Sequence, residues 1–258
     1  MLNEIAGKKR LEIAKRKREK PLRQLEEELV KGGFGFRKAI EARQWALIAE
    51  CKLASPAKGQ LCTGYTECEL ARLYTLNGAA ALSVHTDTHF KGRLENIEMV
   101  KAVTHLPVLR KDFIIDAYQI YESRWAGADA ILLIAALLDD QEMKEYLEIA
   151  TTLGLDSLVE VHTLEELLRV QQTAAVLVGI NNRNLKTFST DINNTFALLP
   201  YCSPEIVLIS ESGIKTGEDA KKLQEAGVKG ILAGEGLVCA RDIGRMTQEM
   251  ALCQMTMI

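Results

Sequence analysis

The sequence predicts an α/β protein with one (β/α)8 barrel, residues 45–258, preceded by an N-terminal helical extension, residues 1–44. Two observations support this prediction. Eight short runs of apolar, often β-branched residues recur after Trp45, and stretches with helical periodicity lie between them. Runs that are apolar almost throughout are typical of parallel strands buried on both faces. Eight alternations over about 210 residues match a barrel rather than a doubly wound sheet.

The expected elements follow in regular order. The first strand begins at Ile48, and the others are expected at residues 80–84, 107–109, 130–135, 157–161, 175–180, 206–209 and 230–233. Helices are expected at residues 67–76, 94–103, 116–126, 140–153, 164–171, 192–199 and 217–226. Glycines 78, 127, 154 and 227 lie where helix C-termini are expected.

The first strand ends in charged residues. Glu50 and Lys52 share one face of an extended chain, because successive side chains alternate. Charges in a strand are costly unless they are paired or used, so this pair indicates a solvated functional cavity. A surface strand with a weak ion pair explains the two residues equally well. The ends of the other strands decide between these interpretations.

Polar residues also follow most of the other predicted strands. In a barrel, the C-terminal ends of the strands converge on one mouth, where catalytic groups lie. Unrelated polar loop starts would explain single residues but explain this mixture of acids, lysines and amides poorly. The residues are Asp87, Lys111, Asp112, Glu160, His162, Asn181, Arg183, Glu211, Ser212, Gly234 and Glu235.

Length and composition indicate one domain. A chain of 258 residues with 47% hydrophobic content can bury one full core. The 32 Lys and Arg against 35 Asp and Glu give a net charge of −3, so neither nucleic acid nor an anionic membrane is expected as a partner. Because no apolar run has membrane-spanning length and the N-terminus lacks a signal peptide's apolar core, we expect a cytoplasmic protein. A monomer is the simplest expectation.

Cysteine and histidine spacing gives no sign of a metal site. The six cysteines form no Cys-x-x-Cys pair and are expected to be reduced and mostly buried. His85 and His89 are four residues apart, but they flank a strand end and a loop, where that spacing does not align them. We therefore expect no bound metal.

The N-terminal segment differs in character from the barrel. Eight lysines and arginines lie between residues 8 and 20, and Leu22 and Leu25 follow Pro21, which predicts two short amphipathic helices. A solvated charged face is the simpler interpretation of the basic residues. The sharper one is that they help to attract an anionic substrate. Because the strand–helix units are complete without this segment, we expect it to serve substrate binding rather than barrel formation.

Two glycine-bearing loops, residues 210–214 and 233–236, follow the last two strands. Loops at this place in barrels frequently bind phosphate through backbone amides. Turn geometry alone could explain Gly236 but explains two adjacent loops less well. Elsewhere in the mouth, Lys111 and Glu160 offer a proton donor and a proton acceptor, unless each belongs to a structural salt bridge.

Five segments together resemble the indole-3-glycerol phosphate synthase family. They occur in order along the chain, each at a predicted strand end, and the N-terminal segment is similar to that family's extension before the barrel. The resemblance spans nearly the whole chain. The segments are residues 48–56, 109–113, 158–161, 179–185 and 210–214.

The resemblance implies a TIM barrel with a defined reaction. The family converts 1-(2-carboxyphenylamino)-1-deoxyribulose 5-phosphate, a sugar phosphate, to indole-3-glycerol phosphate, carbon dioxide and water in tryptophan synthesis. No cofactor is implied, because attack of the aryl carbon on the ketone makes an iminium that accepts the decarboxylation electrons.

The resemblance also implies roles for residues of this chain. Lys111 would be the general acid and Glu160 the base of dehydration. Glu50, Lys52, Asn181, Arg183 and Glu211 would hold the substrate carboxylate, the hydroxyls and the acid–base network. Phe90 and Phe113 would contact the substrate, and the phosphate site would comprise Ser55, Ser212, Gly213, Gly234 and Glu235.

One loop departs from the family pattern. The family often has two adjacent aromatic residues and one more residue after the second strand, and of those aromatics only Phe90 remains within residues 85–92. Two alternative functions also fit a phosphate-binding barrel. A phosphoribosylanthranilate isomerase would share the phosphate site but gives no reason for Glu50, Lys52 and Lys111 together. A non-catalytic sugar-phosphate-binding barrel would be expected to lack catalytic groups, whereas this chain has the expected charged ones.

Overall fold

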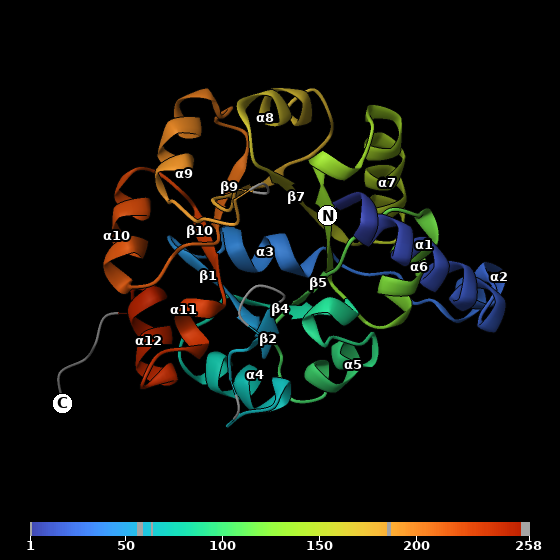
Figure 1. The fold of residues 1–258 in the computed structure, drawn as a ribbon, viewed down its shortest axis with the longest axis horizontal. Helices are drawn as coiled ribbons and strands as arrows, with labels where there is room; N and C mark the ends of the chain where they lie inside the picture. The colour runs from blue at the N-terminus through green and yellow to red at the C-terminus, as the bar shows by residue number, and fades with distance from the viewer. Residues whose placement is uncertain (1, 56–58, 63, 185–186, 254–258) are drawn as a thin grey trace.

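Parallel strands close into a barrel in the order β1-β10-β9-β8-β7-β6-β5-β4, with helices around it (Figure 1). The structure is a computed structural model that describes residues 2–55, 59–62, 64–184 and 187–253, without the side chains of residues 2–4 and 55. The closed TIM barrel confirms the predicted fold class and excludes a doubly wound sheet.

All the predicted barrel strands are present, with ends that differ by a few residues. Their nearly continuous burial explains why they were recognisable from apolar runs alone. The strands are β1 (Ala46–Cys51), β4 (Ala81–His85), β5 (Val108–Lys111), β6 (Ala130–Ile134), β7 (Asp156–Val161), β8 (Leu177–Asn181), β9 (Val207–Glu211) and β10 (Gly230–Ala233). A short hairpin of β2 (Ala54–Ser55) and β3 (Gly59–Gln60), which the sequence did not predict, follows β1.

The helices between the strands also match the expected ranges. Thr66, Asp139 and Thr216 cap three of them with reciprocal capping boxes. The predicted helices are α4 (Glu67–Leu76), α5 (Glu95–Lys101), α6 (Ala117–Trp125), α7 (Asp140–Thr152), α8 (Leu164–Val170), α9 (Asn193–Leu198) and α10 (Gly217–Glu225). Not predicted were α11 (Glu235–Val238), α12 (Ile243–Met250) and the 3₁₀ turns η1 (Thr88–Phe90), η2 (Ala135–Leu137) and η3 (Leu199–Tyr201).

The N-terminal segment forms α1 (Leu2–Glu19), α2 (Leu22–Glu28) and α3 (Gly35–Glu41). The predicted break at Pro21 is present, but α1 has 18 residues and is longer than the short helix expected there. Helices α1 and α2 lie beside α6 (Figure 1), where the Tyr118 hydroxyl donates hydrogen bonds to the carbonyls of Arg16 and Lys20. The N-terminal segment is therefore anchored along α6 on the outside of the barrel.

Helix α3 corrects one expectation. Phe36 and Ile40 are fully buried in the same apolar cluster as Ala46 and Leu177, which lie at strand beginnings. The backbone N–H of Arg37 donates to the carboxylate of Asp156, at the start of β7 (2.9 Å). Helix α3 therefore closes the N-terminal end of the barrel, and the expectation that residues 1–44 take no part in barrel formation is wrong for this helix.

Among the described residues, no helix is both long enough and apolar enough to cross a bilayer.

Candidate active site

A cavity of about 690 Å³ opens at the C-terminal ends of the strands. The strand ends bring together residues that are far apart in the sequence, as the fold predicts. Ser55 belongs to β2, but its side chain lies outside the described part of the structure. All the other predicted site residues line this cavity: Glu50, Lys52, Phe90, Lys111, Phe113, Glu160, Asn181, Arg183, Glu211, Ser212, Gly213, Gly234 and Glu235.

Lys111, the last residue of β5, lies between two carboxylates. Its Nζ is 3.0 Å from Oε2 of Glu211 and 3.5 Å from Oε2 of Glu160. Burial alone would lower the pKa of Lys111, but the charges of Glu211, Glu160 and Glu50 outweigh burial and raise this pKa above its ordinary value. Lys111 is therefore a protonated donor at neutral pH.

Glu211 has the opposite perturbation. Burial, together with the nearby charges of Glu160 and Glu50, raises the pKa of Glu211 to about 7, although Lys111 acts against this shift. Glu211 fits into β9 beside a glycine of β8, because a Cβ at Gly179 would lie only 2.0 Å from Oε1 of Glu211. Gly179 was not among the predicted site residues, since glycine within a strand has several possible meanings.

Glu50 lies at the end of β1 with two partners. Its Oε2 is 3.6 Å from Nζ of Lys52, and its Oε1 is 2.8 Å from Nε2 of His85. Burial would raise the pKa of Glu50, but the charge of Lys52 and the contact with His85 lower it well below the ordinary value. Gly234 leaves room for this carboxylate, because a Cβ there would lie 2.0 Å from Glu50 Oε2. Glu50 is therefore an ionised group inside the cavity.

His162 contacts the predicted base from the end of β7. Its Nε2 is 3.4 Å from Oε1 of Glu160, and its Nδ1 is 3.3 Å from Oε2 of Glu166. Burial would lower the pKa of His162, but the hydrogen bond to Glu166 and the charge of Glu160 raise it overall. A histidine with a raised pKa thus lies beside Glu160.

The loop after β8 is organised by asparagines. Asn181 Oδ1 accepts a hydrogen bond from the backbone N–H of Arg183 (2.9 Å), and an Arg183 Nη1 donates to the carbonyl of Phe188 (3.0 Å). The neighbouring Asn182 donates to Ser210 Oγ and to the carbonyl of Ser212. Asn182, which was not among the predicted site residues, thus fixes the loop after β9 against β8.

The two predicted phosphate loops lie side by side on the cavity wall. Ser212 and Gly213 have φ angles of 64° and 78°, a left-handed conformation that serine rarely adopts. None of the backbone hydrogen bonds of the described turns and loops is donated by the N–H groups of Ser212, Gly213 or Gly234. These amides are therefore available to an anion.

Helix α1 also reaches the site. Ile5 and Lys8 line the cavity, together with Phe188 and Met246. Sequence analysis did not identify these four residues individually, because none belongs to a strand-end motif. Part of the N-terminal segment thus borders the predicted substrate site.

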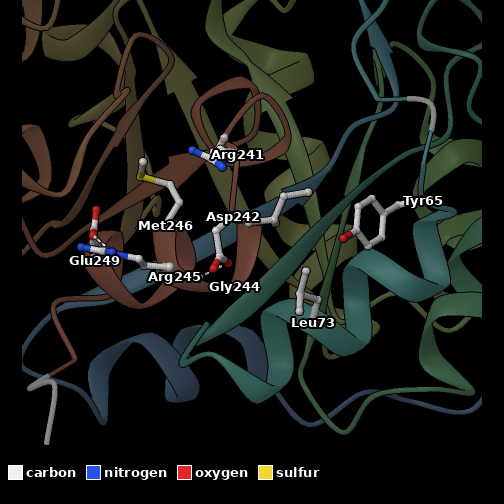
Figure 2. Close-up of a pocket in the computed structure, with 10 residues that line it drawn as sticks. Tyr65, Leu73, Arg241, Asp242, Gly244, Arg245, Met246 and Glu249 are labelled. Carbon is white, nitrogen blue, oxygen red and sulfur yellow. Dashed lines mark hydrogen bonds and ion pairs between the residues drawn. The ribbon is translucent and has the colours of Figure 1, made fainter. Parts of the chain in front are cut away.

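A second cavity, of about 680 Å³, lies between α4 and the beginning of α12 (Figure 2). Charged residues that border this cavity stabilise helix α12. Asp242 caps α12 by accepting a hydrogen bond from the backbone N–H of Arg245, and Arg245 pairs with Glu249 at 2.9 Å. This cavity is therefore bordered by helix-stabilising pairs rather than by an acid–base constellation.

Across the described ranges, no group of three or more His, Cys, Asp and Glu side chains is arranged to hold a metal ion.

Comparisons with known proteins agree with this geometry. The family model for indole-3-glycerol phosphate synthase matches residues 2–250. A protein of that name from Desulforamulus reducens is 50% identical over 220 residues, which cover 84% of this chain and 83% of the relative. One from Legionella pneumophila strain Paris is 43% identical over 252 residues, covering 97% and 98%.

Solved structures support the fold alone, since their sequence identities are low. A 3-hexulose-6-phosphate synthase has a TM-score of 0.63 at 16% identity, covering 80% of this chain and 98% of that one. An N-acetylmannosamine-6-phosphate 2-epimerase from Clostridium perfringens has a TM-score of 0.59 at 19% identity, covering 74% and 86%. Barrel and site together define a TIM-barrel enzyme with acid–base groups at its mouth. The sequence matches identify the family plainly, and the chain belongs to the indole-3-glycerol phosphate synthases.

Proposed function

We propose that the residues of this cavity catalyse ring closure, decarboxylation and dehydration of 1-(2-carboxyphenylamino)-1-deoxyribulose 5-phosphate. The product is indole-3-glycerol phosphate. Family membership makes the protein a decarboxylating lyase of tryptophan biosynthesis. The single observation that supports the residue assignments best is the position of Lys111 between Glu211 and Glu160 inside the cavity. An isomerase of the same pathway would have no use for this arrangement together with Glu50 and Lys52.

Ring closure requires a substrate conformation that brings the two reacting carbons together, and a proton for the ketone oxygen. The aryl carbon attacks the ketone carbon, which leaves negative charge on the former ketone oxygen and an iminium on the ring nitrogen. Lys111 donates its proton to that oxygen, because its ammonium is stabilised until a stronger base forms beside it. Phe90 and Phe113 hold the aromatic ring, so that the two reacting carbons approach each other.

Decarboxylation and dehydration follow. The electron pair of the bond to the carboxylate moves toward the iminium nitrogen as carbon dioxide leaves, and Lys52 pairs with that carboxylate beforehand. Glu211, with a pKa of about 7 and 3.0 Å from Lys111, returns a proton to Lys111 after ring closure. In the dehydration, the C–O bond breaks as Lys111 gives that proton to the departing hydroxyl, which leaves as water, while Glu160 accepts the proton from the neighbouring carbon.

We propose that the loops after β9 and β10 bind the phosphate group. The amides of Ser212, Gly213 and Gly234 support this role, since none of them donates a hydrogen bond within the described turns and loops and all three residues line the cavity. Glu235 lies in the same wall and contributes its backbone, because its carboxylate would repel the anion. A sulfate-soaked crystal tests the assignment, and anion density elsewhere in the mouth would contradict it.

We also propose a monomeric, cytoplasmic enzyme that does not bind nucleic acid. The net charge of −3 supports the last point, because nucleic-acid-binding proteins usually present an excess of basic residues.

The decisive experiment uses the purified full chain with the carboxyphenylamino-deoxyribulose phosphate. Indole fluorescence should appear together with an equal amount of carbon dioxide. An isomerase would give neither signal, and a binding protein would bind the sugar phosphate without changing it. Either result, obtained with folded protein, would refute the proposed function.

A further inference from the structure

His85 ends β4 inside the mouth and contacts two groups of the proposed site. Its Nε2 lies 2.8 Å from Oε1 of Glu50. Its ring stacks on the ring of Phe90, with centroids 4.2 Å apart and planes inclined by 13°. The side chain is only 6% exposed, yet it borders the cavity. One imidazole therefore contacts both the acid cluster and the aromatic wall.

The short loop after β4 brings Phe90 onto His85. The carbonyl of Asp87 accepts hydrogen bonds from the backbone N–H groups of Phe90 (3.1 Å) and Gly92 (3.0 Å), so the chain turns back at once. Gly92 passes so close to β4 that a Cβ would lie 2.3 Å from the carbonyl oxygen of His85. The loop geometry thus requires glycine at residue 92 and fixes the Phe90 ring over the imidazole.

The protonation of His85 follows from its surroundings. Burial lowers its pKa, and the positive charges of Lys52 and Lys111 act in the same direction, whereas Glu50 opposes them. A neutral imidazole has one N–H, and an ionised Glu50 can only accept a hydrogen bond. The Nε2–H tautomer is therefore assigned, with Nε2 as the donor to Glu50.

We propose that His85 is a positioning residue of the active site, which orients Glu50 through its Nε2–H and Phe90 through ring stacking. This inference rests on the proposed function. It explains how the chain builds an aromatic wall with a single phenylalanine in this loop, since the second ring comes from the end of β4. A histidine that only filled the core would need neither the hydrogen bond to Glu50 nor a place at the cavity.

Two substitutions separate the two contacts. His85→Phe keeps a stacking ring but removes the donor, and a hydrogen bond to a charged group corresponds to roughly a 10- to 100-fold effect. We expect kcat to fall by about that factor with little change in KM. His85→Gln keeps an N–H donor but removes the ring, and loss of an aromatic pair corresponds to roughly 2- to 10-fold. We expect this loss in KM, with kcat less affected than in His85→Phe.

The controls distinguish this inference from the proposed function. Wild-type protein must first produce indole fluorescence, since inactive wild type would refute the function rather than the role of His85. His105→Phe and His105→Gln, at an exposed histidine outside the site, should match wild type. Unchanged kinetics in both His85 variants, or the same proportional change of kcat and KM in both, would overturn the positioning role.

A measurement on wild type covers the case in which a His85 variant does not fold. In ¹⁵N-histidine NMR, His85 should be neutral with the proton on Nε2 at pH 7, and its signals should shift when indole-3-glycerol phosphate is added. The proposal would be contradicted by a charged His85 ring or by the Nδ1–H tautomer. His85 signals that do not shift when the product is added would also contradict it.

Discussion

Two clusters of charged side chains lie close together at the barrel mouth, and they differ in how many basic partners each acid has. The α1 cluster joins α1 to β5 and α6, and it contains four acids and four basic residues: Glu12, Asp87, Asp112 and Glu122 with Lys9, Arg16, His89 and Arg110. The mouth cluster contains two lysines and three acids: Lys52 and Lys111 with Glu50, Glu160 and Glu211.

Each acid of the α1 cluster contacts two basic side chains. Lys9 is 1% exposed, and its Nζ contacts both Asp87 and Asp112, the latter at 2.9 Å. Burial would raise the pKa of Asp112, but Arg110 and Lys9 lower it well below its ordinary value. Asp87 contacts Lys9 and His89, and Glu122 contacts Arg16 and Arg110. We interpret this cluster as structural.

In the mouth cluster, Glu211 contacts one basic side chain among the described residues, that of Lys111. Lys111 and Lys52 are 15% and 12% exposed, and Glu211 has a pKa of about 7. Glu50 also contacts His85, and Glu160 also contacts His162, so Glu211 is the acid that binds a proton most readily. The comparison indicates that the number of basic partners of each acid, rather than residue type or burial, separates the proposed acid–base cluster from the structural one.

The largest expected effect is loss of turnover from the mouth cluster. Lys111→Ala should lower kcat by about 10²–10⁴-fold, because one general acid typically contributes that much. The variant should still fold and bind product. Steady-state kinetics by indole fluorescence, with product binding measured by titration, test this expectation. Lys221→Ala, at an exposed lysine of α10, is the matched control. Near-normal turnover in Lys111→Ala would show that the mouth cluster is not the acid–base centre.

Substitutions in the α1 cluster should instead lower the free energy of unfolding. Lys9→Met leaves Asp87 and Asp112 without their shared cation, and breaking a buried pair costs about 3–5 kcal/mol of unfolding free energy. Urea denaturation measures the loss. Lys15→Met, on the same helix with a side chain 70% exposed, should change the free energy by less than about 1 kcal/mol. Equal effects of the two substitutions would contradict the structural interpretation of Lys9.

The raised pKa of Glu211 predicts a loss of stability between pH 4.5 and 7, whereas the lowered pKa of Asp112 in the α1 cluster affects stability at lower pH. A carboxyl whose pKa rises from 4.5 to about 7 on folding binds a proton preferentially in the folded state. Its contribution to stability is therefore complete below pH 4.5 and is lost as the pH rises to 7. Glu211→Gln should remove a decline on the order of 1–3 kcal/mol across this window.

Urea titrations at several pH values measure this decline, and Glu225→Gln on α10 serves as the exposed control. If wild type and Glu211→Gln lose stability in parallel between pH 4.5 and 7, Glu211 is not the group that binds a proton preferentially in the folded state.

The sequence could predict the barrel because each strand is an apolar run of its own. It could predict the mouth because strand ends converge in any such barrel. It could not separate the two clusters, since Asp87 and Asp112 lie near strand ends, as Glu50 and Glu160 do. What distinguishes them is Lys9, which belongs to a basic run that resembles a solvated face but is buried by contact with residues some 80 to 100 positions away.

Long-range packing also explains why sequence analysis missed the roles of Phe36, Ile40 and His85. Phe36 and Ile40 are four residues apart, as in any amphipathic helix, and only the closed barrel shows that they fill its N-terminal end. A truncation that begins near Arg43 would therefore remove part of the core. His85 has an ordinary strand-end position, and its stacking on Phe90 depends on how tightly the following loop turns back.

The smallest expected effect tests whether a charge on the cavity side of α1 contributes more to substrate binding than a charge on its outer side. Lys8 borders the cavity, so its charge should help to attract a substrate with a phosphate and a carboxylate. Lys8→Gln should raise KM by roughly 2- to 5-fold at low salt, the size typical of an exposed charge interaction. The effect should fade in 1 M salt, where screening acts within about 3 Å. Lys15→Gln, which removes the same charge from an outward-facing position of α1, should leave KM unchanged at both salt concentrations. If both variants raise KM equally, the attraction comes from the net charge of the whole helix, and the position of Lys8 at the cavity has no separate importance.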